Sequence, residues 1–180
     1  MLYVYRVEIR DENGNLIYQS PNDEISPNLM FKKIQDQYEL TNATLIQMRL
    51  EPQDAFGERR RDMIRTYSIS AFGDERDKIA PGVRVIIQGL EGYVKHVGSG
   101  RVVVDHNHPL AGRVIDVKVE VIKRLENDME ILNELNNRYS LGLNIRETDG
   151  KIVVEGEEKA KQALKNILTY YGIENDRIQL

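Results

Sequence analysis

The sequence predicts an α+β protein with an antiparallel sheet and one helix, a β-rich lobe inserted into that sheet, and a small C-terminal α-β-β-α domain. Three observations predict this class. Apolar and polar residues alternate with period 2 near both ends of residues 1–124, which is typical of strands. Short β-branched runs separated by glycines fill residues 83–104. After Arg124 the apolar residues follow a helical period instead.

The first fifty residues predict a hairpin, one helix and a further strand. Residues 3–9 alternate as a strand, an Asp-Glu-Asn-Gly turn follows, and residues 15–18 form the returning strand. Ser26 and Pro27 are typical of an N-cap and a first helical residue, so we expect a helix from there to about Tyr38. Residues 44–50 alternate again and predict a strand.

The middle and the end of the chain predict two small units. A basic run and a short helix around residues 68–72 precede three strands joined by glycine turns, at residues 83–87, 93–97 and 101–104. The tail predicts an α-β-β-α unit, with helices to about Tyr139 and over 157–171, and strands at 141–146 and 152–154. A KH-like RNA-binding fold would need a Gly-x-x-Gly loop in this tail, and the tail has none.

A rigid corner links the inserted strands to a long strand at residues 113–123. Pro109 restricts the backbone of His108 to extended conformations, and Gly112 releases the chain into the strand. We therefore interpret Asn107, His108, Pro109 and Gly112 as a structural corner. His106 and His108 alone supply too few ligands for a metal, so we predict neither a metal site nor a cofactor.

The corner carries a family resemblance. Asp105 with residues 107–112, and residues 51–59, resemble the corresponding segments of the archaeal and bacterial SlyD-like FKBP-type peptidyl-prolyl isomerases. The resemblance extends from about Asn42 to Arg124. It implies an FKBP-like core at residues 1–57 plus 109–124, an insert-in-flap chaperone lobe at residues 58–108, and a separate domain at residues 125–180.

The resemblance also implies where a prolyl-isomerase pocket would lie. Phe56 replaces a pocket tyrosine of the family, Ile17 and Tyr18 replace a Phe-Asp pair, and Val117 stands near a pocket phenylalanine. We add Met30 and Phe31 to this degenerate set. These residues either line an apolar cleft or fill a core. Because the pocket carboxylate and one hydroxyl are missing, we expect isomerase activity to be weak or lost.

Three functions follow as alternatives. The first is a cytoplasmic folding helper that binds unfolded or nascent polypeptides through apolar residues of the insert, namely Ile64, Tyr67, Phe72, Leu90 and Tyr93. The second is an active FKBP-type isomerase. The third is a non-enzymatic module that docks on the ribosome or another anionic assembly through Arg59, Arg60 and Arg61, because residues 57–124 carry 13 basic and 9 acidic groups.

The sequence also bears on membrane contact, cysteine chemistry and self-association. No apolar run approaches the 18 residues of a membrane-spanning helix, so we expect no membrane partner. The chain contains no cysteine, which excludes disulfides and thiol catalysis. We further expect that the C-terminal domain can form a homodimer.

Overall fold

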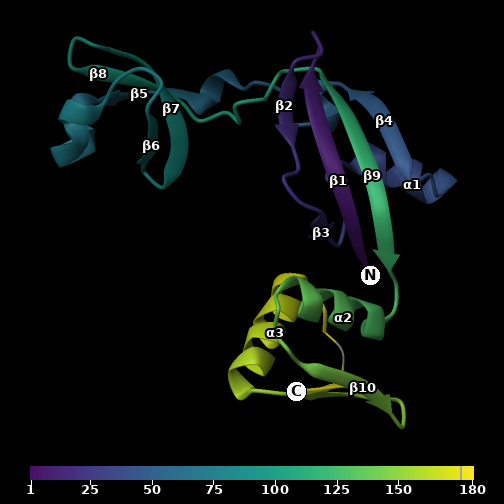
Figure 1. Ribbon diagram of the computed structural model, residues 1–180. Helices are drawn as coiled ribbons and strands as arrows, with labels where there is room; N and C mark the ends of the chain where they lie inside the picture. The colour runs from purple at the N-terminus through teal and green to yellow at the C-terminus, as the bar shows by residue number, and fades with distance from the viewer. Residues whose placement is uncertain (175) are drawn as a thin grey trace. The chain divides into compact units, whose positions relative to one another are not determined.

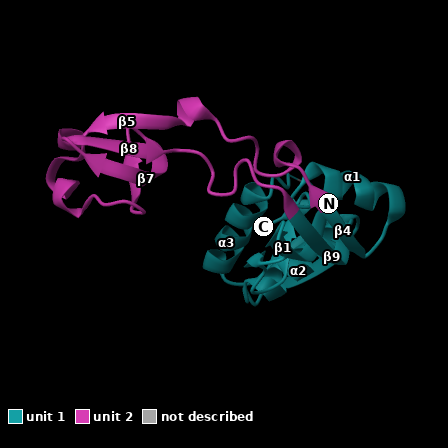
Figure 2. Ribbon diagram, turned by 90° about the horizontal axis from the view of Figure 1, so that it is seen from above, with its two compact units in different colours: residues 1–48, 116–180 teal, residues 49–115 magenta. Residues whose placement is uncertain are grey.

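The computed structural model (Figure 1) describes residues 1–174 and 176–180, and its fold is mixed α+β with mainly antiparallel sheets, as in an FKBP-like fold that carries an insert in its flap. It divides into two compact units, which Figure 2 shows in different colours. The core unit is residues 1–48 with 116–180, and the insert unit is residues 49–115. No helix among the described residues is long and apolar enough to cross a membrane.

A five-stranded antiparallel sheet organises the core unit. Its strands follow the order β2-β1-β9-β4, and β3 pairs with β1 beside β2. The strands are β1 (Leu2–Asp11), β2 (Leu16–Gln19), β3 (Glu24–Ser26), β4 (Leu45–Leu50) and β9 (Ile115–Leu125). The predicted strands and hairpin turn of this region are therefore confirmed. The long strand β9 brings the chain back between β1 and β4 after the insert.

Helix α1 (Lys32–Thr41) begins five residues later than the sequence predicts. The expected start at Ser26-Pro27 is wrong because Ser26 belongs to β3, where it pairs with Tyr3 of β1. Strand pairing has outcompeted the local helix signal, and the N-cap is Phe31. The helix ends at Asn42, which takes the left-handed conformation with φ 50°.

Strand β1 has apolar residues on both faces in its first half. Tyr3 points toward the helix, where its ring meets Tyr38 edge-on with centroids 5.4 Å apart. Leu2 and Val4, which alternate with Tyr3, are almost fully buried in a second cluster formed with the C-terminal helices. Strand β1 therefore packs against helix α1 on one face and against the C-terminal helices on the other.

The C-terminal module, residues 125–180, confirms the predicted α-β-β-α order. Its elements are α2 (Asp128–Arg138), β10 (Asn144–Thr148), β11 (Lys151–Glu155), α3 (Glu158–Tyr170) and an additional short strand, β12 (Ile178–Gln179). Strand β12 pairs parallel to β11 and was not predicted. This module belongs to the same compact unit as the five-stranded sheet, whereas the sequence predicts a separate domain. The predicted domain boundaries stay a prediction.

The insert unit is built around an antiparallel sheet of order β5-β8-β7-β6. Its strands are β5 (Ile64–Ser68), β6 (Arg84–Ile87), β7 (Leu90–Gly98) and β8 (Arg101–Asp105). Strand β5 was not predicted, and the short helix expected around residues 68–72 is a longer 3₁₀ segment, Ile69–Lys78, interrupted at Gly73. The glycine turn expected between the strands at 83–87 and 93–97 consists of Gln88 and Gly89, which both have positive φ, so the second strand begins earlier than predicted, at Leu90.

Candidate functional site

The insert sheet has one packed face and one open face. Alternate side chains from all four strands form its core: Tyr67, Val85, Ile87, Val94, Val102 and Val104. On the opposite face Ile86 is 72% exposed and Ile64 is 38% exposed. Tyr93 joins them, because Ile64 and Tyr93 both lie opposite Asp105 in the strand register. The open face therefore presents Ile64 and Ile86 to solvent, with the half-buried ring of Tyr93 beside them.

Charged side chains surround these apolar residues. Arg84 lies opposite Tyr93 in the register, and Glu91 lies opposite Ile86. Arg84 donates two hydrogen bonds to Glu91, of 2.7 and 2.6 Å, across the same strand pair. An apolar surface with a charged rim can bind an extended apolar segment and still keep the protein soluble.

The predicted binding residues divide between this open face and the core. Ile64 is exposed, while Leu90 and Tyr93 are half-buried. The expectation that Tyr67 lies open is wrong, because its side chain is 8% exposed and belongs to the core. Phe72 is half-buried and meets Tyr67 edge-on, with ring centroids 6.4 Å apart.

Sequence reasoning missed Ile86. In the structure, exposed and buried residues alternate along 84–87, so the buried neighbours Val85 and Ile87 place Ile86 on the other face. The sequence hides this alternation, because Val85, Ile86 and Ile87 are all apolar.

A buried histidine fixes the end of strand β8. His106 is 8% exposed, and its Nδ1 and Nε2 atoms lie 2.8 Å from the Glu91 carbonyl oxygen and 2.9 Å from the Tyr67 hydroxyl oxygen. In the neutral ring, Nδ1 donates to the carbonyl and Nε2 accepts from the hydroxyl. His106 thus connects β8 to β7 and β5, which is a structural role inside the lobe.

The two chain segments that lead into and out of the insert are tied together. We call residues 56–60 and 105–112 the neck. The Asn107 amide makes a reciprocal pair with the backbone of Arg60: Arg60 N donates to Oδ1 at 2.8 Å, and Nδ2 donates to the Arg60 carbonyl at 2.9 Å. Phe56 stacks flat on His108 with ring centroids 4.4 Å apart. Gly112 N donates to the Gly57 carbonyl at 2.8 Å.

These contacts place the predicted corner residues in the neck. Asn107, His108 and Gly112 each contact the incoming segment, and Pro109 lies in the turn between them. Gly112 has φ 75°, and an added Cβ would lie 3.1 Å from the Cβ of Arg59. The position therefore favours glycine both for its backbone conformation and for its space.

An ion pair completes the neck. Asp105, whose side chain is 7% exposed, accepts hydrogen bonds from Arg59 and from the backbone and side chain of Asn107. Burial alone would raise the pKa of Asp105, but the bonds from Asn107 and the charge of Arg59 outweigh it and hold the pKa below its usual range.

This pKa shift predicts acid sensitivity of the insert unit. Because the pKa of Asp105 is depressed in the folded state, its contribution is present above the unfolded value of about 3.9 and is lost as pH falls through the folded value. We expect the Asp105→Asn variant to be less stable at pH 6, on the order of 1 kcal/mol, and to lose less on acidification to pH 3. Urea unfolding at both pH values measures this.

The matched control is Asp62→Asn. The pKa of Asp62 is also lowered, chiefly by its hydrogen bond from Arg60, but that pair is fully exposed. Exposed ion pairs contribute little to stability. Equal acid sensitivity in the Asp105→Asn variant and the wild-type protein would contradict the assignment.

The three consecutive arginines Arg59, Arg60 and Arg61 differ in their surroundings. Arg59 pairs with Asp105 and Arg60 pairs with Asp62, while Arg61 begins a short 3₁₀ turn. Two of the three guanidinium groups are thus already engaged by carboxylates. The contact with the ribosome that the sequence suggests stays a prediction.

The residues at the predicted isomerase pocket are placed in different surroundings. Val117 and Phe31 are buried, at 0% and 6% exposure, whereas Met30 is 40% exposed. Ile17 is half-buried on β2, and Phe56 belongs to the insert unit, where it stacks on His108. The sequence left open whether these residues line an apolar cleft or fill a core, and for Val117 and Phe31 the burial favours a filled core.

Tyr18, at the position of the lost pocket carboxylate, lies in a hydroxyl cluster. Its hydroxyl donates to Glu24 Oε1 at 2.7 Å, and the Ser20 hydroxyl donates to the same oxygen at 2.8 Å. Nearby, burial and the Glu24 carboxylate raise the pKa of Tyr5 to about 12. Sequence reasoning did not identify Glu24, because its contacts depend on β3 pairing with β1.

Comparison with known proteins adds one match. A family model described as FKBP26, IF domain, matches residues 76–110, which include β6, β7, β8 and the start of the corner. The insert unit is therefore similar to a domain of the FKBP family, and this supports an FKBP-type protein. No curated protein matches the chain.

Proposed function

We propose that this protein is an FKBP-type folding helper that holds unfolded or proline-containing polypeptides on the open face of its insert sheet. The observation that carries the proposal is the pair of exposed side chains Ile64 and Ile86, with the half-buried Tyr93 beside them, on a sheet whose other face is already packed. The similarity of residues 76–110 to an insert domain of the FKBP family supports it.

The edges of the sheet offer a second means of binding. β5 and β6 are the outermost strands, and each pairs with one neighbour in the described sheet. An extended polypeptide can add to such an edge through backbone hydrogen bonds, which do not depend on its sequence. The exposed side chains of Ile64 and Ile86 stand on these two strands, so backbone pairing and apolar contact would act together.

The double variant Ile64→Ser with Ile86→Ser tests the proposal. Because both side chains are exposed, the lobe should stay folded, while each lost apolar contact weakens client binding. We expect about tenfold more protein to be needed for half-maximal suppression of aggregation of an unfolded client. Light scattering during refolding measures this, and circular dichroism checks the fold.

The matched control is Leu40→Ser with Leu45→Ser, which removes two exposed leucines from the core unit. We expect this control to suppress aggregation like the wild-type protein. If the Ile64/Ile86 variant is folded and retains full suppression, the proposed face is not the client site.

We propose further that prolyl isomerase activity is weak or lost. Tyr18 replaces the pocket carboxylate implied by the resemblance, and Val117 and Phe31 are packed in the core. The turnover of a Phe-Pro peptide, measured beside the aggregation assay, separates this proposal from the alternative of an active isomerase. A cytoplasmic location and a homodimer through the C-terminal module remain predictions.

A further inference from the structure

A polar groove separates the edge of the core sheet from helix α2. It has a volume of about 660 Å³ and lies between the β2–β3 loop, strand β9 and the helix. Its walls carry the cations Arg6, Lys123 and Arg138 and the carboxylates Asp23 and Glu134. All of these residues belong to the core unit, and none belongs to the proposed client site.

Both carboxylates of the groove are already engaged. Arg6 Nε donates to Asp23 Oδ1 at 2.6 Å. Lys123 Nζ donates to Glu134 Oε2 at 2.9 Å, and Arg138 Nη2 lies 3.4 Å from Glu134 Oε1. Since three cations face two carboxylates, one positive charge remains in excess. An added anion would compensate it.

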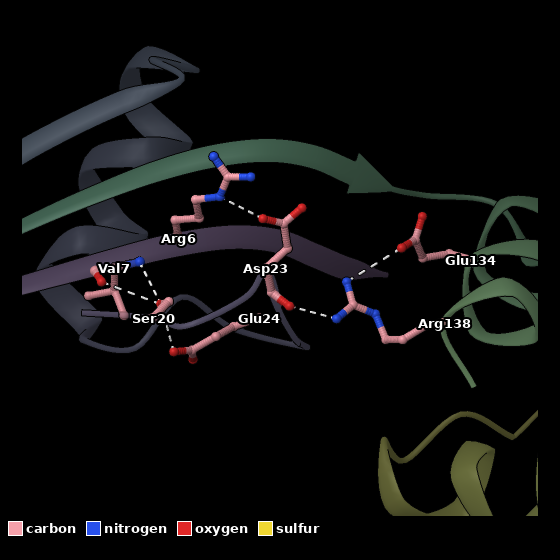
Figure 3. Close-up of polar contacts among 7 residues, drawn as sticks. All are labelled: Arg6, Val7, Ser20, Asp23, Glu24, Glu134 and Arg138. Atoms are coloured by element: carbon pink, nitrogen blue, oxygen red, sulfur yellow. Dashed lines mark hydrogen bonds and ion pairs between the residues drawn. The ribbon is translucent and has the colours of Figure 1, made fainter. Parts of the chain in front are cut away.

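Arg138 also has an unused donor. Figure 3 shows its guanidinium approaching Asp23 from the side opposite Arg6, and Arg138 Nη1 donates to the Asp23 backbone carbonyl at 2.6 Å. The Nε atom is buried and has no hydrogen-bond partner among the described residues. A buried charged donor without a partner is unfavourable, and such a group is usually satisfied by water or by a bound ion.

We propose that this groove binds a small oxyanion, the carboxylate or phosphate group of a ligand. The ligand oxygens would accept from the guanidinium groups of Arg6 and Arg138 and from the Lys123 ammonium, in the charge-assisted geometry that arginine favours. This site is independent of client binding by the insert, so the failure of either proposal leaves the other untouched.

The NMR signal of the Arg138 Nε–H group in the full-length protein tests the site directly. We expect sodium acetate or sodium phosphate to shift this signal in a saturable way, and sodium chloride at equal ionic strength to leave it nearly unchanged. Saturation by acetate alone identifies a carboxylate ligand, and saturation by phosphate alone identifies a phosphate ligand. A shift no larger than that caused by chloride would refute the proposal.

Two variants with opposite expected effects make the test specific. Lys123→Gln removes a groove cation and should weaken oxyanion binding about threefold, whereas Glu134→Gln removes a groove carboxylate and should strengthen it by a similar factor. Arg146→Gln is the control, because Arg146 pairs with Glu155 on β10 and β11, and Arg146 does not line the groove. The same affinity in all three variants would overturn the assignment.

Discussion

The Leu132→Ala variant is expected to destabilise the entire core unit by about 2–5 kcal/mol, the usual cost of removing a fully buried leucine side chain. Leu132 lies on α2 in the C-terminal module, in the same hydrophobic cluster as Leu2 and Val4 of β1. Because β1 also packs against α1 through Tyr3, a cavity at Leu132 should weaken both the module and the sheet.

Hydrogen exchange measured strand by strand distinguishes this from independent folding of the module. We expect amides of β1 and β9 to lose protection together with those of α2, whereas amides of β7 and β8 in the insert unit keep theirs. Leu40→Ala is the matched control, since Leu40 is 82% exposed and its removal leaves no cavity. Loss of protection confined to residues 128–180 would mean that the module folds separately, as the sequence predicts.

The sequence predicted strands well where one face is buried and the other is solvated. In β9, buried and exposed residues alternate from Ile115 to Val121, and the pattern is visible in the sequence. The sequence predicted secondary structure less well where tertiary contacts determine it. Strand β5 is rich in polar residues and forms by pairing with β8, and the start of α1 depends on β3 pairing with β1. Neither partner can be identified from local pattern.

The packing of β1 on both of its faces is visible in the sequence. Residues 2–5 read Leu-Tyr-Val-Tyr, apolar at every position, which is typical of a strand covered on both faces. The cover on the second face is the C-terminal module. If apolar and polar residues alternated at positions 2–5, one face of β1 would be expected to contact solvent, and the C-terminal module would be expected not to pack on it.

The candidate site was predictable only in part, for the same physical reason. Apolar composition led to the prediction that the insert is a binding lobe, but composition does not reveal which apolar residues form its own core. Tyr67 is core because strand pairing places it opposite Val102, and Ile86 is exposed because its neighbours point inward. The neck residues Asn107, His108 and Gly112 were recognisable because a proline corner constrains the local backbone.

The Gly92→Ala variant is expected to unfold or distort the insert lobe, at a cost of about 3 kcal/mol. A Cβ at Gly92 would lie 2.7 Å from His106 Nδ1, 2.7 Å from Val104 Cγ1 and 2.8 Å from the Asp105 carbonyl oxygen. Two of these atoms belong to packed side chains and the third to the backbone, so a small side-chain shift cannot relieve the overlap. The methyl group would push β7 away from β8 and break the bond between His106 and the Glu91 carbonyl.

Gly100→Ala separates this overlap from backbone strain. Gly100 has φ 74° but open space around its Cβ, so the change should cost only about 1 kcal/mol, the penalty of a left-handed alanine. We expect hydrogen exchange at Val94 and Val104 to accelerate strongly in Gly92→Ala and weakly in Gly100→Ala, with amides of β1 unchanged in both. Because the proposed client face needs a folded sheet, Gly92→Ala should also abolish the expected suppression of aggregation. Similar protection in the two variants would show that the close approach of β7 and His106 does not limit the stability of the lobe.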